Sequence, residues 1–126
     1  MTHHSRLRGF IIDCQTGDLV GAAEFWAAAF GDAKRRKPQG KYVKLDPQAG
    51  LAVEVQKVDH PSRVHIDLAS DDVEAEVARL EKLGATRVRT LSNWTVMEAP
   101  TGHRFCVIRA RRPDFAATAT AWEGEA

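Results

Sequence analysis

Apolar residues in this chain follow two spacings, one typical of strands and one typical of helices, and each spacing occurs twice. Branched and aromatic side chains crowd residues 7–14, which predicts a strand, and from residue 19 apolar positions recur at helical spacing up to Gly31. The same order returns at residues 63–69, followed by a second helical pattern that stops at Gly84. Glycine ends helices because it adopts the left-handed conformation without a steric cost. The pattern therefore predicts two copies of one strand and helix unit.

Each predicted helix has a capping residue and one apolar face. Asp18 is expected to cap the first helix, and Asp71, with Glu74 three residues later, resembles a capping box for the second. The expected buried positions are Leu19, Ala22, Ala23, Trp26, Ala27 and Phe30 in the first helix and Val73, Val77, Leu80 and Leu83 in the second.

Three short strands are expected after each helix, separated by turns that contain proline and glycine. They lie near residues 34–36, 42–46 and 51–58 in the first copy and near 86–89, 94–98 and 104–108 in the second. The sequence thus predicts an α+β fold in which two tandem βαβββ units form a half-closed, cup-shaped mixed sheet with helices on the outer face.

One domain is expected over residues 7–109, with its first unit at 7–58 and its second at 63–109. The tail at 111–126 reads as appended, and both a short helix near 116–122 and disorder stay open for it.

Alternation along the strands divides their side chains between two faces of the sheet. The face expected under the helices carries Phe10, Ile12, Cys14, Leu51, Val53, Val55, Val64, Ile66, Leu68, Phe105 and Val107. The opposite face carries Gly9, Ile11, Asp13, Glu54, Gln56, His65, Asp67, Arg104, Cys106 and Ile108. The second face contains many groups that donate, accept or ligate, which favours a ligand pocket over a merely solvated surface.

Composition narrows the class of protein further. The 126 residues are 44% hydrophobic and 28% charged, as in one globular domain, and the formal charge of +1 is too weak to favour a nucleic-acid or membrane partner. The basic run at residues 34–37 is expected to be solvated, and the histidines at positions 3 and 4 are expected to be incidental. Two cysteines and the absence of a long apolar stretch favour a reduced, cytoplasmic protein.

Several phrases of the sequence together resemble the vicinal oxygen chelate superfamily, and more narrowly the glyoxalase-like, bleomycin-resistance-type domains of small bacterial proteins. These phrases are residues 11–14 leading to 23–26 and Gly31, residues 64–68 leading to 71–73, and residues 100–107. The resemblance covers residues 7–109 and implies the duplicated βαβββ fold. Members of this superfamily include isomerases, ring-cleaving dioxygenases, thiol transferases that open epoxides, and drug-sequestering proteins without chemistry. They often form dimers.

The resemblance also implies where a metal would bind. Metal-dependent members carry ligands at the start of the first strand and on the last strand of each unit, which here correspond to Gly9, Glu54 or Gln56, His65 and Cys106. Only His65 is a usual ligand type at a position that can be placed with certainty; glycine has no side chain, and cysteine replaces the usual glutamate. We expect no cofactor and no complete metal site, while a divalent metal held by His65 and Glu54 stays open.

The candidate ligand-binding residues are Glu54, Gln56, His65, Asp67, Trp94 and Cys106. His65 is the candidate catalytic group because imidazole ordinarily titrates near neutrality, with a purely structural role beside Asp67 or backbone as the alternative. For Trp94 two roles stay open, stacking on a planar ligand and core packing at the rim, and Cys106 is expected to be a packing group unless a neighbour activates it.

Three functions follow from these residues. The favoured one is a small-molecule-binding protein of the glyoxalase and bleomycin-resistance superfamily with a concave pocket and an incomplete metal site. The second is a divalent-metal-dependent lyase, isomerase or dioxygenase of the same superfamily. The third is a non-catalytic, dimeric interaction module. A small-molecule ligand and a second copy of the chain are the expected partners, and whether the protein is an enzyme stays open.

Overall fold

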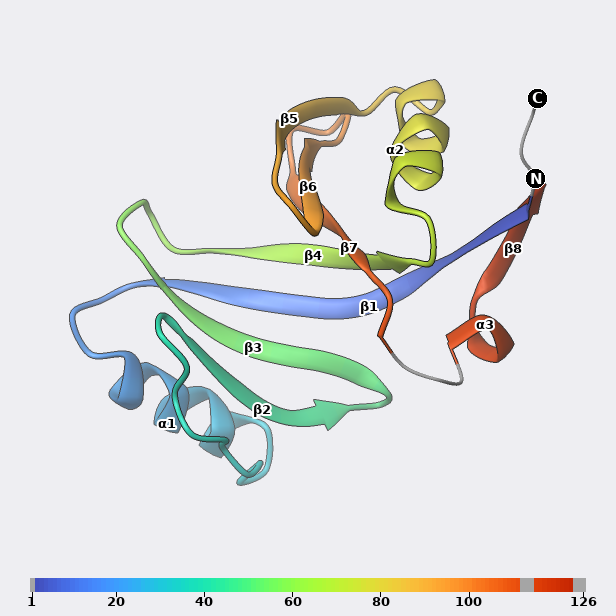
Figure 1. The fold of residues 1–126 in the computed structure, drawn as a ribbon. Coiled ribbons are helices and arrows are strands. Elements are labelled where there is room, and N and C mark those ends of the chain that lie inside the picture. The colour runs from blue at the N-terminus through green and yellow to red at the C-terminus, as the bar shows by residue number, and fades with distance from the viewer. Residues whose placement is uncertain (1, 112–114, 124–126) are drawn as a thin grey trace. The chain divides into compact units, whose positions relative to one another are not determined.

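The computed structural model describes residues 2–111 and 115–123, which form an α+β arrangement of eight strands and three helices (Figure 1). The strands are β1 (Thr2–Gln15), β2 (Tyr42–Gln48), β3 (Leu51–Val58), β4 (Arg63–Ser70), β5 (Thr86–Thr90), β6 (Trp94–Glu98), β7 (Arg104–Arg109) and β8 (Thr120–Glu123). The helices are α1 (Leu19–Ala29), α2 (Val73–Lys82) and α3 (Phe115–Thr118). The chain divides into two compact units, one formed by Gly9–His65 and the other by the residues on either side of it.

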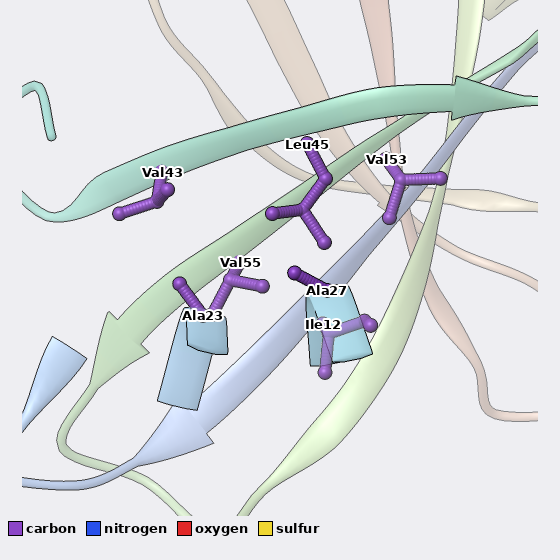
Figure 2. Packing of buried hydrophobic residues seen from close by; sticks show 7 residues of the cluster. All are labelled: Ile12, Ala23, Ala27, Val43, Leu45, Val53 and Val55. Atoms are coloured by element: carbon purple, nitrogen blue, oxygen red, sulfur yellow. The ribbon is translucent and has the colours of Figure 1, made fainter. Parts of the chain in front are cut away.

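The Gly9–His65 unit contains β2, β3, the second half of β1 and helix α1. Strand β3 pairs in parallel with β1 and antiparallel with β2, and α1 packs on β2 and β3. Figure 2 shows the core between helix and strands, formed by Ile12, Ala23, Ala27, Val43, Leu45, Val53 and Val55. Burying each of the larger side chains contributes about 1.5–3 kcal/mol. The predicted apolar faces of α1, β1 and β3 are therefore confirmed.

Local sequence explains where α1 begins and ends. The Asp18 side chain accepts a hydrogen bond from the Gly21 backbone amide at 2.9 Å, so the predicted N-cap is confirmed. Gly31 follows the helix with φ of 82°, a conformation that favours glycine.

The second unit repeats this architecture. Strand β7 pairs in parallel with β4 and antiparallel with β6, which pairs with β5, and α2 packs on β5, β6 and β7. Its core consists of Val77, Leu80, Ala85, Met97 and Val107. In the first unit Arg35 forms an isolated bridge with Leu45 of β2. Residue 35 therefore pairs with β2 in the way that β5 pairs with β6. The duplicated βαβββ order predicted from the sequence is thus present.

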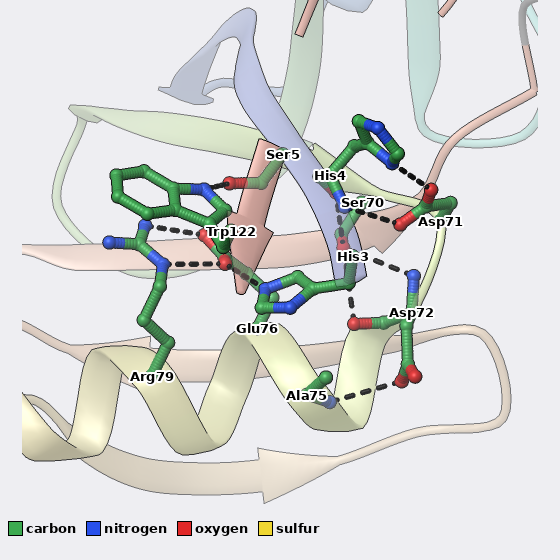
Figure 3. Close-up of polar contacts among 10 residues, drawn as sticks. All are labelled: His3, His4, Ser5, Ser70, Asp71, Asp72, Ala75, Glu76, Arg79 and Trp122. Carbon is green, nitrogen blue, oxygen red and sulfur yellow. Dashed lines mark hydrogen bonds and ion pairs between the residues drawn. The ribbon is translucent and has the colours of Figure 1, made fainter. Parts of the chain in front are cut away.

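The N-cap of α2 is Asp72, whose side chain accepts from the Ala75 amide at 3.0 Å, so the prediction of Asp71 as cap was wrong by one residue. Asp71 instead accepts two hydrogen bonds of 2.7 Å from His4, one from its backbone amide and one from Nδ1 (Figure 3). Both aspartates can cap a helix in isolation, and the tertiary contact with His4 decides between them.

The chain ends are more ordered than the sequence suggested. Strand β1 begins at Thr2 and pairs with β8 of the tail, which contains α3 and a strand where one helix or disorder was expected. The histidines expected to be incidental are both bonded, His3 to Glu76 and His4 to Asp71. Those parts of the tail prediction that fall on residues 112–114 and 124–126 lie outside the described residues.

Three further details differ from the sequence prediction. The strand expected at 34–36 is reduced to the single bridge at Arg35. Leu83 is 65% exposed because it is the C-cap of α2, past the last buried turn. Val64 and Ile66 are 55% and 47% exposed because α1 packs on β2 and β3 and α2 on β5 to β7, which leaves the start of β4 uncovered.

Within the described residues, no helix combines the length and apolar character needed to cross a membrane.

Candidate functional site

A row of polar side chains crosses the sheet of the Gly9–His65 unit on the face opposite α1. Gln56 of β3 lies opposite both Asp13 of β1 and Tyr42 of β2 in the strand register. Gln56 Nε2 donates to Tyr42 Oη at 3.0 Å, and Asp13 contacts His65 of β4. We refer to Tyr42, Gln56, Asp13 and His65 as the polar band. The alternation in the sequence correctly predicted that Asp13, Gln56 and His65 share this face.

Asp13 and His65 form a short, nearly buried hydrogen bond. His65 Nδ1 lies 2.8 Å from Asp13 Oδ2, and the two side chains are 15% and 2% exposed, respectively. An ionised carboxylate can only accept hydrogen bonds, so Nδ1 is the donor.

The Asp13 carboxylate is only partly satisfied. Arg63 Nε lies 3.7 Å from Oδ2, which is an ion pair without a short hydrogen bond. Oδ1 is buried and has no hydrogen-bond partner among the residues that the structure describes. A buried acceptor without a partner lowers the stability of the folded state by about 1–3 kcal/mol, so stability alone does not explain this carboxylate.

Strand alternation predicts the correct face for Asp13, but the sequence suggests Asp67 or backbone as partners of His65 and gives no sign of the contact with Asp13. The two residues are 52 positions apart, and their contact depends on how β1 is placed in the sheet. The sequence shows only that the alternation of β1 and β4 puts Asp13 and His65 on the same face.

Glu54 is a further acidic group of this face. It is 9% exposed and lies opposite Ile11 of β1 and Lys44 of β2 in the register. Its carboxylate therefore adds an acceptor to the row next to the polar band.

The remaining predicted site residues belong to the second unit. Asp67 lies opposite Cys106 in the register of β4 and β7, and their ligating atoms lie within 4.8 Å of each other. Arg8 Nη1 lies 3.4 Å from Asp67 Oδ2. Trp94 of β6 is 38% exposed and lies opposite Ile108 of β7. Trp94 and Cys106 share one face, because the buried Met97 and Val107 occupy the other.

The fit of a metal can be tested in the Gly9–His65 unit, which contains three of the positions implied by the superfamily. A Cβ atom at Gly9 would overlap the backbone oxygen of Ala52, so no ligating side chain fits at this position unless β1 and β3 separate. Of the implied positions in this unit, His65 and either Glu54 or Gln56 then carry a side chain that could ligate, and Cys106, the remaining position, belongs to the other unit. The residues of this unit do not fit the ligand set that the superfamily implies.

The cysteine of β1 is not an activated nucleophile. Burial, and then the negative charge of Asp13, raise the pKa of Cys14 above its ordinary value, although a hydrogen bond with Trp26 acts in the opposite direction. Because the thiolate is the reactive form, Cys14 is less reactive than an exposed cysteine.

The basic segment of this unit lines a separate cleft on the helix side. The cleft has a volume of about 260 Å³ and is lined by Val20, Ala23, Arg35, Arg36, Lys37, Pro38 and Val43. Arg35 Nη1 lies 3.1 Å from the Glu24 carboxylate, which offsets part of the positive charge. The polar band contributes no residue to this cleft.

A second carboxylate and histidine pair stabilises the other unit (Figure 3). Glu76 of α2 is fully buried, accepts from Arg79 Nε and Nη2 at 2.8 Å each, and lies 2.8 Å from His3 Nε2. The Arg79 guanidinium stacks on the Trp122 ring at 3.8 Å, and Trp122 Nε1 donates to Ser5 Oγ at 2.9 Å. These contacts join the start of β1, α2 and β8.

A duplicated βαβββ unit whose strands carry polar groups opposite the helices defines a vicinal oxygen chelate type of domain. The chain belongs to the glyoxalase-like domain family, which its sequence matches over residues 9–108. No curated protein matches it.

Solved structures share the fold at low sequence identity. A glyoxalase/bleomycin resistance protein/dioxygenase superfamily member from Vibrio splendidus is 14% identical with a TM-score of 0.55, over 84% of this chain and 99% of that one. A protein named as NAD-dependent benzaldehyde dehydrogenase from Legionella pneumophila is 8% identical with a TM-score of 0.61, over 81% and 99% of the two chains. Homoprotocatechuate 2,3-dioxygenase from B. fuscum is 12% identical with a TM-score of 0.56; the match covers 96% of this chain but 34% of the dioxygenase. These similarities establish the fold. The activity has to be inferred from the residues of the candidate site.

Proposed function

We propose that this protein binds a small organic molecule at the polar band of the Gly9–His65 unit, as a member of the glyoxalase and bleomycin-resistance superfamily with an incomplete metal site. The observation that supports this most strongly is the buried Asp13 carboxylate that holds the His65 imidazole at 2.8 Å. An oriented imidazole is a group that recognises ligands, and the sheet face around it is rich in further donors and acceptors.

The chemistry of the band favours a planar or polar ligand such as a metabolite or an antibiotic. Tyr42 is 38% exposed and offers both a ring face and a hydroxyl, while Gln56 offers an amide. Asp67, Trp94 and Cys106 stay predicted ligand contacts of the second unit. Gly9 offers no ligand at one of the implied positions, a divalent-metal enzyme that uses His65 and Glu54 stays the alternative, and dimerisation and a cytoplasmic location stay predictions.

Ligand screening with matched variants tests the proposal. A library of planar and polar metabolites and antibiotics is screened by thermal shift, and each hit is confirmed by titration against wild type, His65→Ala and Gln56→Ala. We expect at least one class of compound to bind wild type and to lose at least about tenfold in affinity in both variants, equivalent to about 1.4 kcal/mol. Glu74→Gln changes an exposed carboxylate of the second unit and serves as the control that keeps affinity.

Two outcomes would contradict the proposal. If no member of a broad library binds, or if hits bind all variants equally, the polar band is not the ligand site. Elemental analysis of protein purified without chelator is run in parallel. Stoichiometric metal that disappears in His65→Ala would overturn the incomplete metal site and favour the metal-dependent enzyme.

A further inference from the structure

We propose that the cleft of about 260 Å³ between α1, residues 35–38 and Val43 is a second ligand site, which binds a small organic anion. The anion has a carboxylate or phosphate group and an apolar part about the size of one aromatic ring. We refer to this site as the basic cleft. The inference goes beyond the proposed function, because the polar band contributes no residue to the basic cleft.

The charged wall of the basic cleft is fixed to the sheet. Arg35 forms a bridge with Leu45 of β2, and the Arg36 amide donates to the Lys44 carbonyl at 2.8 Å. The Leu45 side chain belongs to the core under α1. Because directly paired residues present their side chains on the same face, Arg35 is directed toward the helix, in agreement with its ion pair of 3.1 Å to Glu24 of α1. The backbone of this segment is therefore held in place before any ligand binds.

The positive charge of the basic cleft is only partly balanced. Arg35, Arg36 and Lys37 line the cleft, and no acidic residue is part of its lining. Glu24 contacts one of these cations. The side chains of Arg36 and Lys37 are exposed and make no hydrogen bond or ion pair with the part of the chain that the structure describes. Because like charges on consecutive residues repel each other, an anion bound among them is favoured.

The rest of the lining is apolar, which selects an anion with an apolar part. Ala23 and Val43 belong to the buried core (Figure 2), and Val20 and Pro38 complete the lining. An apolar group that leaves water on this surface contributes about 25 cal/mol per Å² of buried area, whereas a bare inorganic ion gains nothing from it. The volume of about 260 Å³ is below the roughly 300–1,000 Å³ of sites for drug-sized ligands, so the occupant is small.

The basic residues select the acidic group. A guanidinium donates two parallel hydrogen bonds to a carboxylate or a phosphate, and the ammonium group of lysine adds a point charge. A nucleic-acid backbone would instead need many phosphate contacts on a broadly basic surface, and the formal net charge of the chain is only +1. The observations therefore favour a small anion over a polyanion.

Titration with four probes at low ionic strength tests the inference. Phenyl phosphate and benzoate have both a ring and a charge, inorganic phosphate lacks the ring, and benzamide lacks the charge. By isothermal titration calorimetry we expect at least one of the two aryl anions to bind at least about tenfold more tightly than inorganic phosphate and benzamide. If neither aryl anion binds more tightly than these two controls, the inference is overturned.

Variants of exposed residues place the binding in the basic cleft. Arg36→Gln and Lys37→Gln should each weaken the aryl anion about tenfold, because each removes one charged donor. Glu24→Gln removes the carboxylate that competes for Arg35 and should strengthen binding. Arg89→Gln changes an exposed arginine of β5 and is the control that keeps the affinity. Unchanged affinity in both cleft variants, or an equal loss in Arg89→Gln, contradicts the site.

The apolar contact has its own variant. Val20 is 48% exposed, so Val20→Ser keeps the fold, and it should weaken the aryl anion while inorganic phosphate binds as before. An unchanged affinity for the aryl anion contradicts the apolar contact. A single-stranded oligonucleotide that binds more tightly than the aryl anions, and is weakened by Lys37→Gln, would assign the cleft to a polyanion and overturn the inference. The proposed function fails separately, because His65→Ala and Gln56→Ala leave the basic cleft intact.

Discussion

This protein contains two carboxylates that are almost completely buried and that each contact a histidine at 2.8 Å, yet the two pairs are built for different purposes. Glu76 has every neighbour that a buried acid needs, since Arg79 donates twice and His3 once more. Asp13 has His65 on one oxygen and no hydrogen-bond partner on the other within the described residues. The histidine contact alone therefore says little about the role of a buried acid.

The electrostatics of Glu76 agree with a structural role. Burial by itself would raise the pKa of Glu76, but the hydrogen bonds from Arg79, His3 and Ser5 and the charge of Arg79 outweigh it and lower the pKa below its ordinary value. A buried acid that stays ionised because its hydrogen bonds are complete is part of the scaffold. The less satisfied pair in the other unit is the better candidate for function.

Removing the Glu76 side chain should have the largest effect on stability. In Glu76→Ala the Arg79 guanidinium and the buried His3 lose their acceptor, so we expect the free energy of unfolding to fall by about 3 kcal/mol. Urea denaturation measures it. Arg87→Ala, which breaks an exposed pair with Glu74, should cost no more than about 1 kcal/mol. A loss below 1 kcal/mol in Glu76→Ala would remove the contrast between the two pairs.

The pH dependence of stability should show the same contrast. Because the folded pKa of Glu76 is lowered, the unfolded state binds more protons in the window between the two pKa values. The contribution of Glu76 is thus complete above the ordinary glutamate value of about 4.3 and is lost as the pH falls through the lower folded pKa. Urea unfolding from pH 7 to 3 should show wild type losing its advantage over Glu76→Gln as the pH falls. An advantage that does not change with pH would contradict this account.

The Asp13 pair should contribute far less to stability than the Glu76 pair. Asp13→Asn keeps the size of the side chain and can still bond to His65, so we expect the free energy of unfolding to change by about 1 kcal/mol or less. Urea denaturation beside Glu76→Ala gives the comparison. A loss as large as that of Glu76→Ala would mean that Asp13 is also part of the scaffold, despite its unpartnered oxygen.

The sequence could predict which face of the sheet Asp13 and His65 occupy, but it could not predict the long-range contacts of either pair. Alternation along β1 and β4 placed Asp13 and His65 on one face, because strand periodicity is local. It could not predict that they touch, nor that His3 reaches Glu76 across 73 positions, because both contacts depend on the placement of strands distant in sequence. His3 was expected to be incidental, since nothing in the sequence near a chain end indicates that a histidine there will be buried.

The smallest expected effect is on the reactivity of Cys14, and it reports on the charge of Asp13. Burial, and then the Asp13 charge, raise the pKa of Cys14, so Asp13→Asn should lower this pKa part of the way and leave the contribution of burial. In a Cys106→Ser background, alkylation of Cys14 by iodoacetamide near pH 8 should become a few times faster, because more thiolate is present. Glu74→Gln in the same background is the control that leaves the rate unchanged, since Glu74 is exposed and is not among the groups that shift the pKa of Cys14. An unchanged rate in Asp13→Asn would mean that Asp13 carries no charge near Cys14, which would also remove the ionised acceptor that orients His65.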